Sequence, residues 1–273
     1  MPLGYAAGHF RFYRKEGIMD NISLVSLYSG SKGNSTYIRF GNDEILIDAG
    51  RSMRALCNAL CSIGSDLERI KAIFITHEHS DHISALEMLS KKYRIPIHIT
   101  ETSAKKVLAT SKYARQNLVC HPPLYEVAVG ELTVRSFPTP HDSEMSVGYT
   151  VSTADGEKIG YATDIGHITS EIRENLLGSS AVVLESNHDT DMLRNGPYPA
   201  WLKTRIGSKV GHLSNKECAE FIPELAASGT KDILLAHLSA ENNTPVAALE
   251  SAKGAGCSLN ICVAKEGEPT RLL

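Results

Sequence analysis

Three histidines and an aspartate lie within six residues of one another, directly after an apolar run. The run is Ala72-Ile73-Phe74-Ile75, and the polar segment is Thr76-His77-Glu78-His79-Ser80-Asp81-His82. The apolar run is typical of a buried strand. A single histidine after a strand is usually structural, but this cluster would be mutually repulsive and unsatisfied without a cation. Imidazole and carboxylate ligands suit zinc, manganese or iron, so the segment predicts a metal site at the end of a strand.

The composition limits the class of protein. A chain of 273 residues with 42% hydrophobic and 22% charged residues is typical of a globular protein. No apolar run approaches the roughly 20 residues that span a bilayer, so we expect no membrane partner. Six scattered cysteines form no disulfide-like framework, which favours a cytoplasmic location. The net charge of -3 gives no general attraction for nucleic acid, so a polyanion would need a local basic patch.

Hydrophobic patterning predicts an α/β protein in two similar halves, each with strands followed by helices. Residues 1–19 are expected to be a flexible leader or a mis-assigned start, and residues 20–273 a single domain. The strands expected in the first half are Ile22–Tyr28, Thr36–Phe40, Ile45–Ile47, Ala72–Ile75 and Pro96–Ile99. The helices expected there are Ser52–Ile63, His82–Lys92 and Ser103–Ser111.

The second half begins with four expected strands and continues with alternating helices and strands. The strands are Tyr125–Val129, Leu132–Phe137, Val147–Ser152, Lys158–Ala162, Ile233–Ala236 and Leu259–Val263. A capping box at Ser214-Asn215-Lys216-Glu217 predicts a helix to about Ala227. Thr244-Pro245 supplies the N-cap and first-turn proline of the next helix.

Three more potential ligands follow strands. His141 comes after the strand that ends at Phe137, Asp164 after the one that ends at Ala162, and His237 directly after Ala236. Each alone has an ordinary structural explanation, but loop residues at strand ends can converge on one edge. Together with the first cluster they make seven ligands, enough for two adjacent ions.

These seven residues resemble the ligand motifs of the metallo-β-lactamase fold, an αββα sandwich of two β-sheets flanked by helices. Carried over position by position, the resemblance assigns one metal to His77, His79 and His141. It assigns the second metal to Asp81, His82 and His237. Asp164 would bridge both. Asp48 matches the first motif of the fold and is expected to orient a ligand histidine rather than to bind metal itself.

Three further segments resemble the YycJ/WalJ branch of this superfamily. They are Ser29–Ser35, Leu184–Asp189 and Gly211–Asn215. Members of the branch are regarded as exonuclease-like DNA-processing enzymes. The resemblance therefore implies a phosphodiesterase with two divalent metal ions that hydrolyses DNA, as an exonuclease. Glu185 and His212 also look like the general acid/base region of tRNase Z-type nucleases.

The chemistry follows from such a metal pair. Two cations roughly 3.5–4 Å apart activate a water and stabilise an in-line phosphoryl displacement. Binding lowers the pKa of the water from about 15.7 towards 7, which makes a metal-bound hydroxide available. The candidate catalytic residues are Asp81, Glu185, His188 and His212. Either histidine outside the ligand set could protonate the leaving 3′-oxygen, with Glu185 as its orienting partner. The structural alternatives are a helix N-terminal residue for His212 and a surface loop residue for His188.

A local basic stretch offers contacts for the substrate. It contains Lys203, Arg205 and Lys209, with Trp201 interleaved, and phosphate backbones and bases favour such side chains. The structural alternative is an amphipathic helix at Ala200–Ile206 with Trp201 in the core. Asn34, in a glycine-containing turn, is a further candidate contact.

Other functions remain open at this point. The same metal pair could hydrolyse thioesters, lactones or RNA, or the chain could be a non-catalytic metal-bound scaffold for a signalling partner. Zinc, manganese and Fe(II) all accept these ligands. The oligomeric state is likewise undetermined by the sequence.

Overall fold

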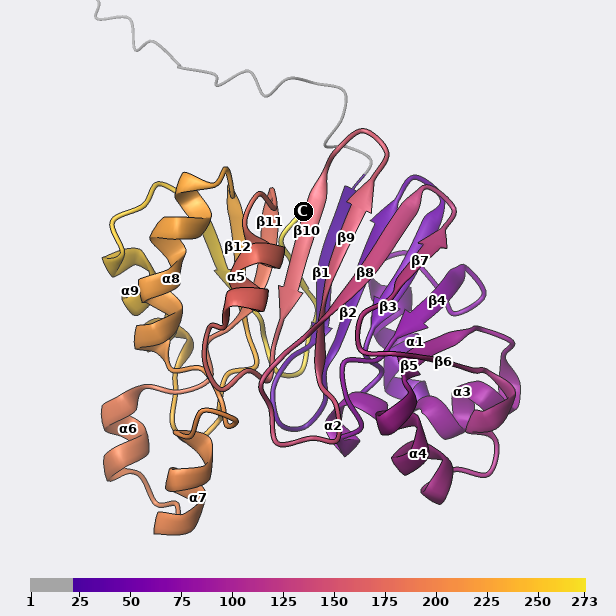
Figure 1. The fold of residues 1–273 in the computed structure, drawn as a ribbon, viewed down its shortest axis with the longest axis horizontal. Helices are drawn as coiled ribbons and strands as arrows, with labels where there is room; N and C mark the ends of the chain where they lie inside the picture. Colours follow the sequence, from indigo (N-terminus) through magenta and orange to yellow (C-terminus); the bar gives the residue numbers. More distant parts are fainter. Residues whose placement is uncertain (1–21) are drawn as a thin grey trace, which may run out of the picture.

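Two seven-stranded sheets pack face to face in the computed structural model, which describes residues 22–273 (Figure 1). Helices cover both outer faces. The expected αββα sandwich is therefore confirmed. The leader predicted at residues 1–19 lies outside the described residues.

The first sheet has the strand order β14-β1-β2-β3-β4-β5-β6. Neighbours from β3 to β6 are parallel, whereas β2 is antiparallel to both β1 and β3. The strands are β1 (Ile22–Tyr28), β2 (Ser35–Phe40), β3 (Asp43–Ile47), β4 (Ile70–Phe74), β5 (Ile97–Thr100), β6 (Leu118–His121) and β14 (Thr270–Arg271). The helices packed on its outer face are α1 (Met53–Ser62), α3 (Leu86–Lys92) and α4 (Glu101–Thr110).

The second sheet has the order β13-β12-β11-β10-β9-β8-β7, and its strands β10 to β13 are parallel. The strands are β7 (Glu126–Val129), β8 (Leu132–Pro138), β9 (Val147–Thr153), β10 (Lys158–Ala162), β11 (Ala181–Glu185), β12 (Asp232–Ala236) and β13 (Asn260–Val263). The helices on its outer face are α5 (Ser170–Leu176), α8 (Asn215–Ala227) and α9 (Pro245–Gly254). Two further helices, α6 (Thr190–Asn195) and α7 (Ala200–Ile206), project beyond the lower edge of this sheet in Figure 1.

The strands build three apolar layers because their successive side chains point to opposite faces. In the segment of β4, Ala72 and Phe74 pack between the two sheets, whereas Ile73 and Ile75 pack under the helices of the first sheet. In β11, Val183 faces the other sheet. Runs with apolar residues on both faces therefore mark strands that are buried on both sides. Among residues 22–273, no helix is long and apolar enough to cross a membrane.

The continuous helix expected at His82–Lys92 is wrong. The structure has a short helix α2 (Ser80–Ile83) and a separate α3. In an unbroken helix the Asp81 carbonyl would accept from the Ala85 N–H. Instead it accepts from Asn34 N at 2.8 Å, and Ala85 N donates to the carbonyl of Ala49 at 2.9 Å. The loops after β1 and β3 thus take the hydrogen bonds that would continue the helix.

The elements missed by the sequence pattern include β6, α5, α6 and β14. All are short, at seven residues or fewer, and too short for a clear periodic signal. The capping box that begins α8 is present as predicted, with both reciprocal hydrogen bonds formed.

Gly50 generates a stability prediction, because a Cβ atom there would lie 1.6 Å from the Asp81 carbonyl oxygen. Gly50→Ala is expected to lower the free energy of unfolding by more than about 2 kcal/mol, since the backbone contact that holds the polar segment must open. Urea denaturation measures this. Gly254→Ala is the matched control, because its Cβ would meet nothing within 4 Å. A Gly50→Ala protein as stable as that control would contradict the predicted packing.

Candidate metal centre

The seven predicted ligands meet at one edge of the sandwich. Segments that follow β4, β8, β10 and β12 carry them. Strands β10 and β12 run parallel, and β8 and β10 both run antiparallel to β9, so these carboxyl ends meet at a shared edge. Four ligands come from the first sheet and three from the second. The site therefore lies across the seam between the two sheets.

Three residues at these strand ends adopt the left-handed backbone conformation. They are Asp48 with φ 63°, Asp164 with φ 55° and His237 with φ 57°, and they are the only non-glycine residues with positive φ in the described part of the chain. Such conformations cost about 1–3 kcal/mol each and cluster at functional sites. The bends turn all three side chains back towards the seam, a feature that residue spacing does not reveal.

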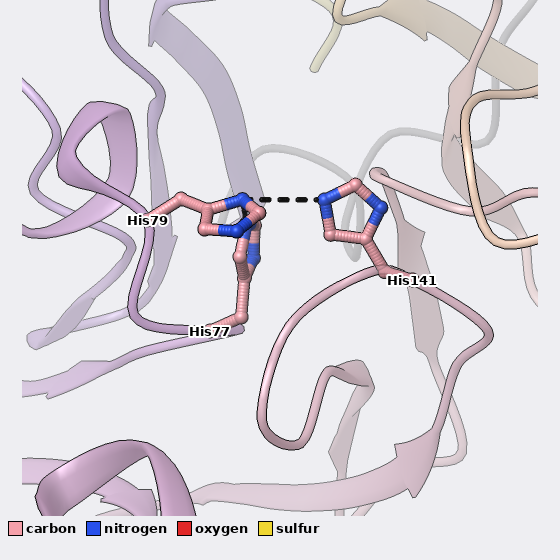
Figure 2. A group of neighbouring side chains, drawn as sticks. All are labelled: His77, His79 and His141. Carbon is pink, nitrogen blue, oxygen red and sulfur yellow. Dashed lines mark hydrogen bonds between the residues drawn. The ribbon is translucent and has the colours of Figure 1, made fainter. Parts of the chain in front are cut away.

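His77, His79 and His141 form the first ligand group, with ligand atoms all within 4.8 Å of one another (Figure 2). Nδ1 of His79 lies 3.0 Å from Nε2 of His77 and 3.3 Å from Nε2 of His141. Burial lowers the pKa of both His77 and His141, and neighbouring histidines lower that of His77 further. Neutral imidazoles facing one another offer lone pairs to a common point, which is a suitable arrangement for a divalent cation.

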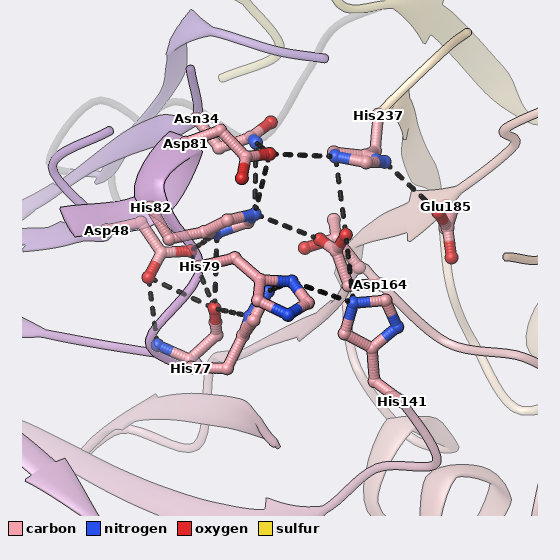
Figure 3. Close-up of polar contacts among 12 residues, drawn as sticks. Asn34, Asp48, His77, His79, Asp81, His82, His141, Asp164, Glu185 and His237 are labelled. Carbon is pink, nitrogen blue, oxygen red and sulfur yellow. Dashed lines mark hydrogen bonds and ion pairs between the residues drawn. The ribbon is translucent and has the colours of Figure 1, made fainter. Parts of the chain in front are cut away.

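Asp81, His82 and His237 form the second group, again within 4.8 Å (Figure 3). Oδ2 of Asp81 lies 3.4 Å from Nε2 of His82 and 3.7 Å from Nε2 of His237. Burial lowers the pKa of His237, but the carboxylates of Asp164, Asp81 and Glu185 outweigh it and raise this pKa to about 10. The surrounding negative charge therefore favours a cation at this position.

Asp164 lies between the two groups. Its Oδ2 is 3.3 Å from Nε2 of His82, and its Oδ1 is 3.3 Å from Nε2 of His237 and 3.8 Å from Nε2 of His141. Two buried atoms here, Asp164 Oδ2 and His237 Nε2, have no hydrogen-bond partner among the described residues. Buried polar atoms are rarely left unpaired, so these residues fit a bound divalent metal.

Asp48 contacts His82 and lies outside the two candidate ligand groups. Its Oδ2 lies 2.8 Å from Nδ1 of His82. Thr76 holds the carboxylate in turn, with its backbone N donating to Oδ1 at 2.8 Å and its hydroxyl to Oδ2 at 2.9 Å. All three residues are buried. The contact leaves Nε2 of His82 facing the cluster. Hydrogen bonds of this kind, from a carboxylate to the outer nitrogen of a histidine, are usual around metal sites.

Glu185, the last residue of β11, is fully buried and contacts two histidines. Its Oε1 lies 2.7 Å from Nδ1 of His212 and 3.2 Å from Nδ1 of His237. Its Oε2 accepts from the Ile165 backbone N at 2.7 Å. Burial raises the pKa of Glu185, but the two histidines lower it well below its usual range. The carboxylate thus fixes His212 with Nε2 directed away from Glu185.

His188 is buried rather than exposed on a loop, and Asn34 contacts two of the candidate ligands. His188 is only 4% exposed, so the surface-loop alternative is wrong. Its Nδ1 is buried and has no hydrogen-bond partner among residues 22–273. The Asn34 amide donates to Gly30 O at 3.1 Å and to Asp81 Oδ2 at 3.2 Å, and lies 3.1 Å from His82 Nε2. Asn34 therefore contacts the side chains of two candidate ligands, Asp81 and His82.

Ser29 was missed by sequence reasoning, although it precedes the glycine-containing turn. Its hydroxyl accepts from the His237 backbone N at 2.7 Å. This bond ties the turn of the first sheet to a ligand of the second sheet. The two positions are far apart in the sequence, so only the fold reveals their contact.

The basic stretch lies on α7 and the loop after it. Trp201 is 68% exposed, so the alternative that placed it in the core is wrong. Lys203 donates to the Arg194 carbonyl at 2.8 Å, and Arg205 forms an ion pair with Asp142, next to His141. Lys209 is exposed. Arg205 is thus paired within the protein, whereas Lys209 and Trp201 face solvent.

Comparisons with known proteins agree with this geometry. The family model described as "Beta-lactamase superfamily domain" matches residues 43–237. An exodeoxyribonuclease YycJ of Bacillus anthracis is 33% identical over 80% of this chain and 82% of its own length. An exodeoxyribonuclease WalJ of Streptococcus pneumoniae is 34% identical over 80% of this chain and 81% of its own. The chain belongs to the YycJ/WalJ branch of the beta-lactamase superfamily.

A solved structure supports the fold assignment. The metallo-β-lactamase fold protein YhfI of Bacillus subtilis superposes with a TM-score of 0.71 at 16% identity, over 92% of this chain and 99% of that one. As a member of the YycJ/WalJ branch, the protein is an enzyme, a metal-dependent hydrolase. Its histidine and aspartate groups are suited to divalent metals.

Metal removal is expected to destabilise this YycJ/WalJ-type protein. A cation that binds only the folded state at about 100 times its Kd contributes about 2.7 kcal/mol, which corresponds to a Tm shift of about 5–10 °C. Calorimetry with and without EDTA measures the shift, and elemental analysis measures the bound metal. His141→Ala should reduce both, whereas His167→Ala, which removes a ring that hydrogen-bonds the Lys209 carbonyl and belongs to neither ligand group, should reduce neither. An unchanged Tm after chelation of metal-loaded protein would contradict the assignment.

Proposed function

We propose that this protein is an exodeoxyribonuclease that hydrolyses DNA with two divalent metal ions. The observation that carries the proposal is the placement of Asp164 between two three-residue ligand groups. His77, His79 and His141 would hold one ion. Asp81, His82 and His237 would hold the other. Zinc or manganese is favoured, with Fe(II) as a third candidate, because imidazole and carboxylate ligands serve all three.

The protein's own residues prepare the nucleophile. When bound, a pair of divalent ions supplies hydroxide at neutral pH and neutralises charge on the phosphodiester. Asp81 Oδ2 faces Asn34, His82 and His237, so its other oxygen is free to accept a hydrogen bond from the attacking water. The Asp81 side chain is 22% exposed, so water can reach it.

His212 donates the proton that the leaving 3′-oxygen needs. Glu185 accepts from its Nδ1, which holds the ring in place and aims Nε2 outward. The His212 side chain is 15% exposed, so it can meet a substrate. His188 lies in the same cavity wall but is not hydrogen-bonded to Glu185. His212 is therefore the favoured acid, and His188 is left for a binding role.

DNA as substrate is supported by the names of the two relatives and by the exposed surface of α7. Trp201 can stack on a base, and Lys209 and Lys203 can meet phosphates. Free cysteines at all six positions fit a reducing cytoplasm, where the enzyme would meet its substrate.

Degradation of end-labelled, 5′-phosphorylated duplex DNA tests the proposal. Protein reconstituted with manganese or zinc is expected to release nucleotides stepwise. His82→Ala should lose metal and activity together. His212→Ala should keep its metal and lose about 10²–10⁴-fold in kcat, the usual contribution of a general acid. His167→Ala controls for loss of a histidine nearby.

Two results of this experiment would contradict parts of the proposal. Protein that holds two metals per chain and leaves both duplex and single-stranded DNA intact is not an exodeoxyribonuclease. Loss of metal from His212→Ala would instead make His212 a ligand, in the group it forms with Asp164, Glu185 and His237.

A further inference from the structure

A cavity of about 660 Å³ lies beside the metal centre, between α6, α7 and the beginning of α8. His212 and His188 are both in its wall. Its volume is within the range of about 300–1,000 Å³ typical of small-molecule sites. Through His212, the cavity is continuous with the position that the proposed mechanism gives to the leaving oxygen.

His188 has no partner in the protein to explain it. The residue is only 4% exposed, and its Nδ1 is buried without a hydrogen-bond partner in the described part of the chain. Burial lowers its pKa, so the ring is neutral at neutral pH. An unpaired nitrogen on a buried ring is costly, so the position of His188 in this cavity wall points to a ligand that packs against the ring.

Charge distinguishes this cavity from a second one. The cavity beside His212 has three cationic and two anionic side chains: Arg194, Lys203, Lys216, Glu217 and Glu220. A cavity of about 670 Å³ on the His79 side has one cationic and three anionic side chains: Lys106, Glu78, Asp142 and Glu144. A phosphate is therefore attracted to the first cavity and repelled by the second.

The cations of the first cavity are available to a ligand. Lys203 uses one of its three N–H groups on the Arg194 carbonyl. Arg194 pairs with Asp191 on the surface, where both are about three-quarters exposed, and such pairs are weak. Glu217 is occupied by the capping box with Ser214, and Glu220 faces Lys216 at 3.9 Å.

We infer that this cavity binds the nucleotide that carries the leaving 3′-oxygen, with its 5′-phosphate against Lys203 and Arg194 and its sugar or base against His188. The inference rests on the proposed function, since His212 connects the cavity to the reaction. A nucleotide held there places its 3′-oxygen next to Nε2 of His212. The site thus selects a 5′-phosphorylated nucleotide over a nucleoside.

Calorimetric titration of the zinc-loaded protein with 5′-dAMP, 3′-dAMP and 2′-deoxyadenosine tests the inference. The 5′-monophosphate is expected to bind at least about tenfold more tightly than the nucleoside, because one charge-assisted hydrogen bond to the phosphate is enough to give that difference in Kd. Lys203→Ala should raise the Kd for 5′-dAMP by about tenfold and raise KM for DNA more than it lowers kcat. Lys253→Ala, on the exposed surface of α9, should change neither.

NMR of the histidine rings locates the ligand. The ring signals of His188 should shift on addition of 5′-dAMP and not on addition of inorganic phosphate, which can bind at the metals. Equal affinity for 5′-dAMP in wild type and Lys203→Ala, with His188 signals unmoved, would overturn the inference. If that result came with normal DNA hydrolysis, the proposed function would stand without this site. Binding of 5′-dAMP by a protein without nuclease activity would retain the site and remove the function.

Discussion

The edge of this sandwich depends on how a buried cluster of imidazoles and carboxylates is held together, and that cluster is suited to divalent cations. Neutral imidazoles in the first ligand group and carboxylates in the second are buried together with unpaired atoms at Asp164 and His237. Such a cluster is unfavourable alone and favourable around metal ions. Because the ligands come from both sheets, bound metal also cross-links the two halves of the molecule at their seam.

The residues around the cluster hold its side chains in position. Asp48 and Glu185 each accept a hydrogen bond from a histidine of the cluster and so fix which of its nitrogens faces the other candidate ligands. The Asp81 carbonyl accepts a hydrogen bond from the Asn34 backbone N. This contact ends a helix early and directs the polar segment into the seam. The left-handed backbone conformations at Asp164 and His237 also cost conformational free energy. The fold thus holds a strained, preorganised arrangement where two sheets meet.

Much of this was predictable from the sequence, for a physical reason. Polar residues that directly follow apolar runs must lie at strand ends, and parallel strands bring those ends together. The sequence therefore predicted that the candidate ligands from His77 to His237 converge, and the structure brings them together. The order of the motifs carried the family assignment, and the capping box at Ser214 was encoded within four residues. These signals are local, or repeat at a fixed period.

What could not be predicted depends on contacts between distant segments. The break after Ile83 arises from a bond to Ala49, and the exposure of Trp201 arises from how far α7 projects. The bond between Ser29 and the His237 backbone joins opposite ends of the chain. Helical spacing gave no information on any of these, because each depends on tertiary packing rather than on local preference.

Anomalous diffraction from crystals of protein loaded with manganese or zinc tests the central claim most directly. The account predicts two peaks at this edge, one within bonding distance of His77, His79 and His141, the other of Asp81, His82 and His237. Asp164 should contact both. A single peak, or a second peak that avoids Asp164, would contradict the two-metal site.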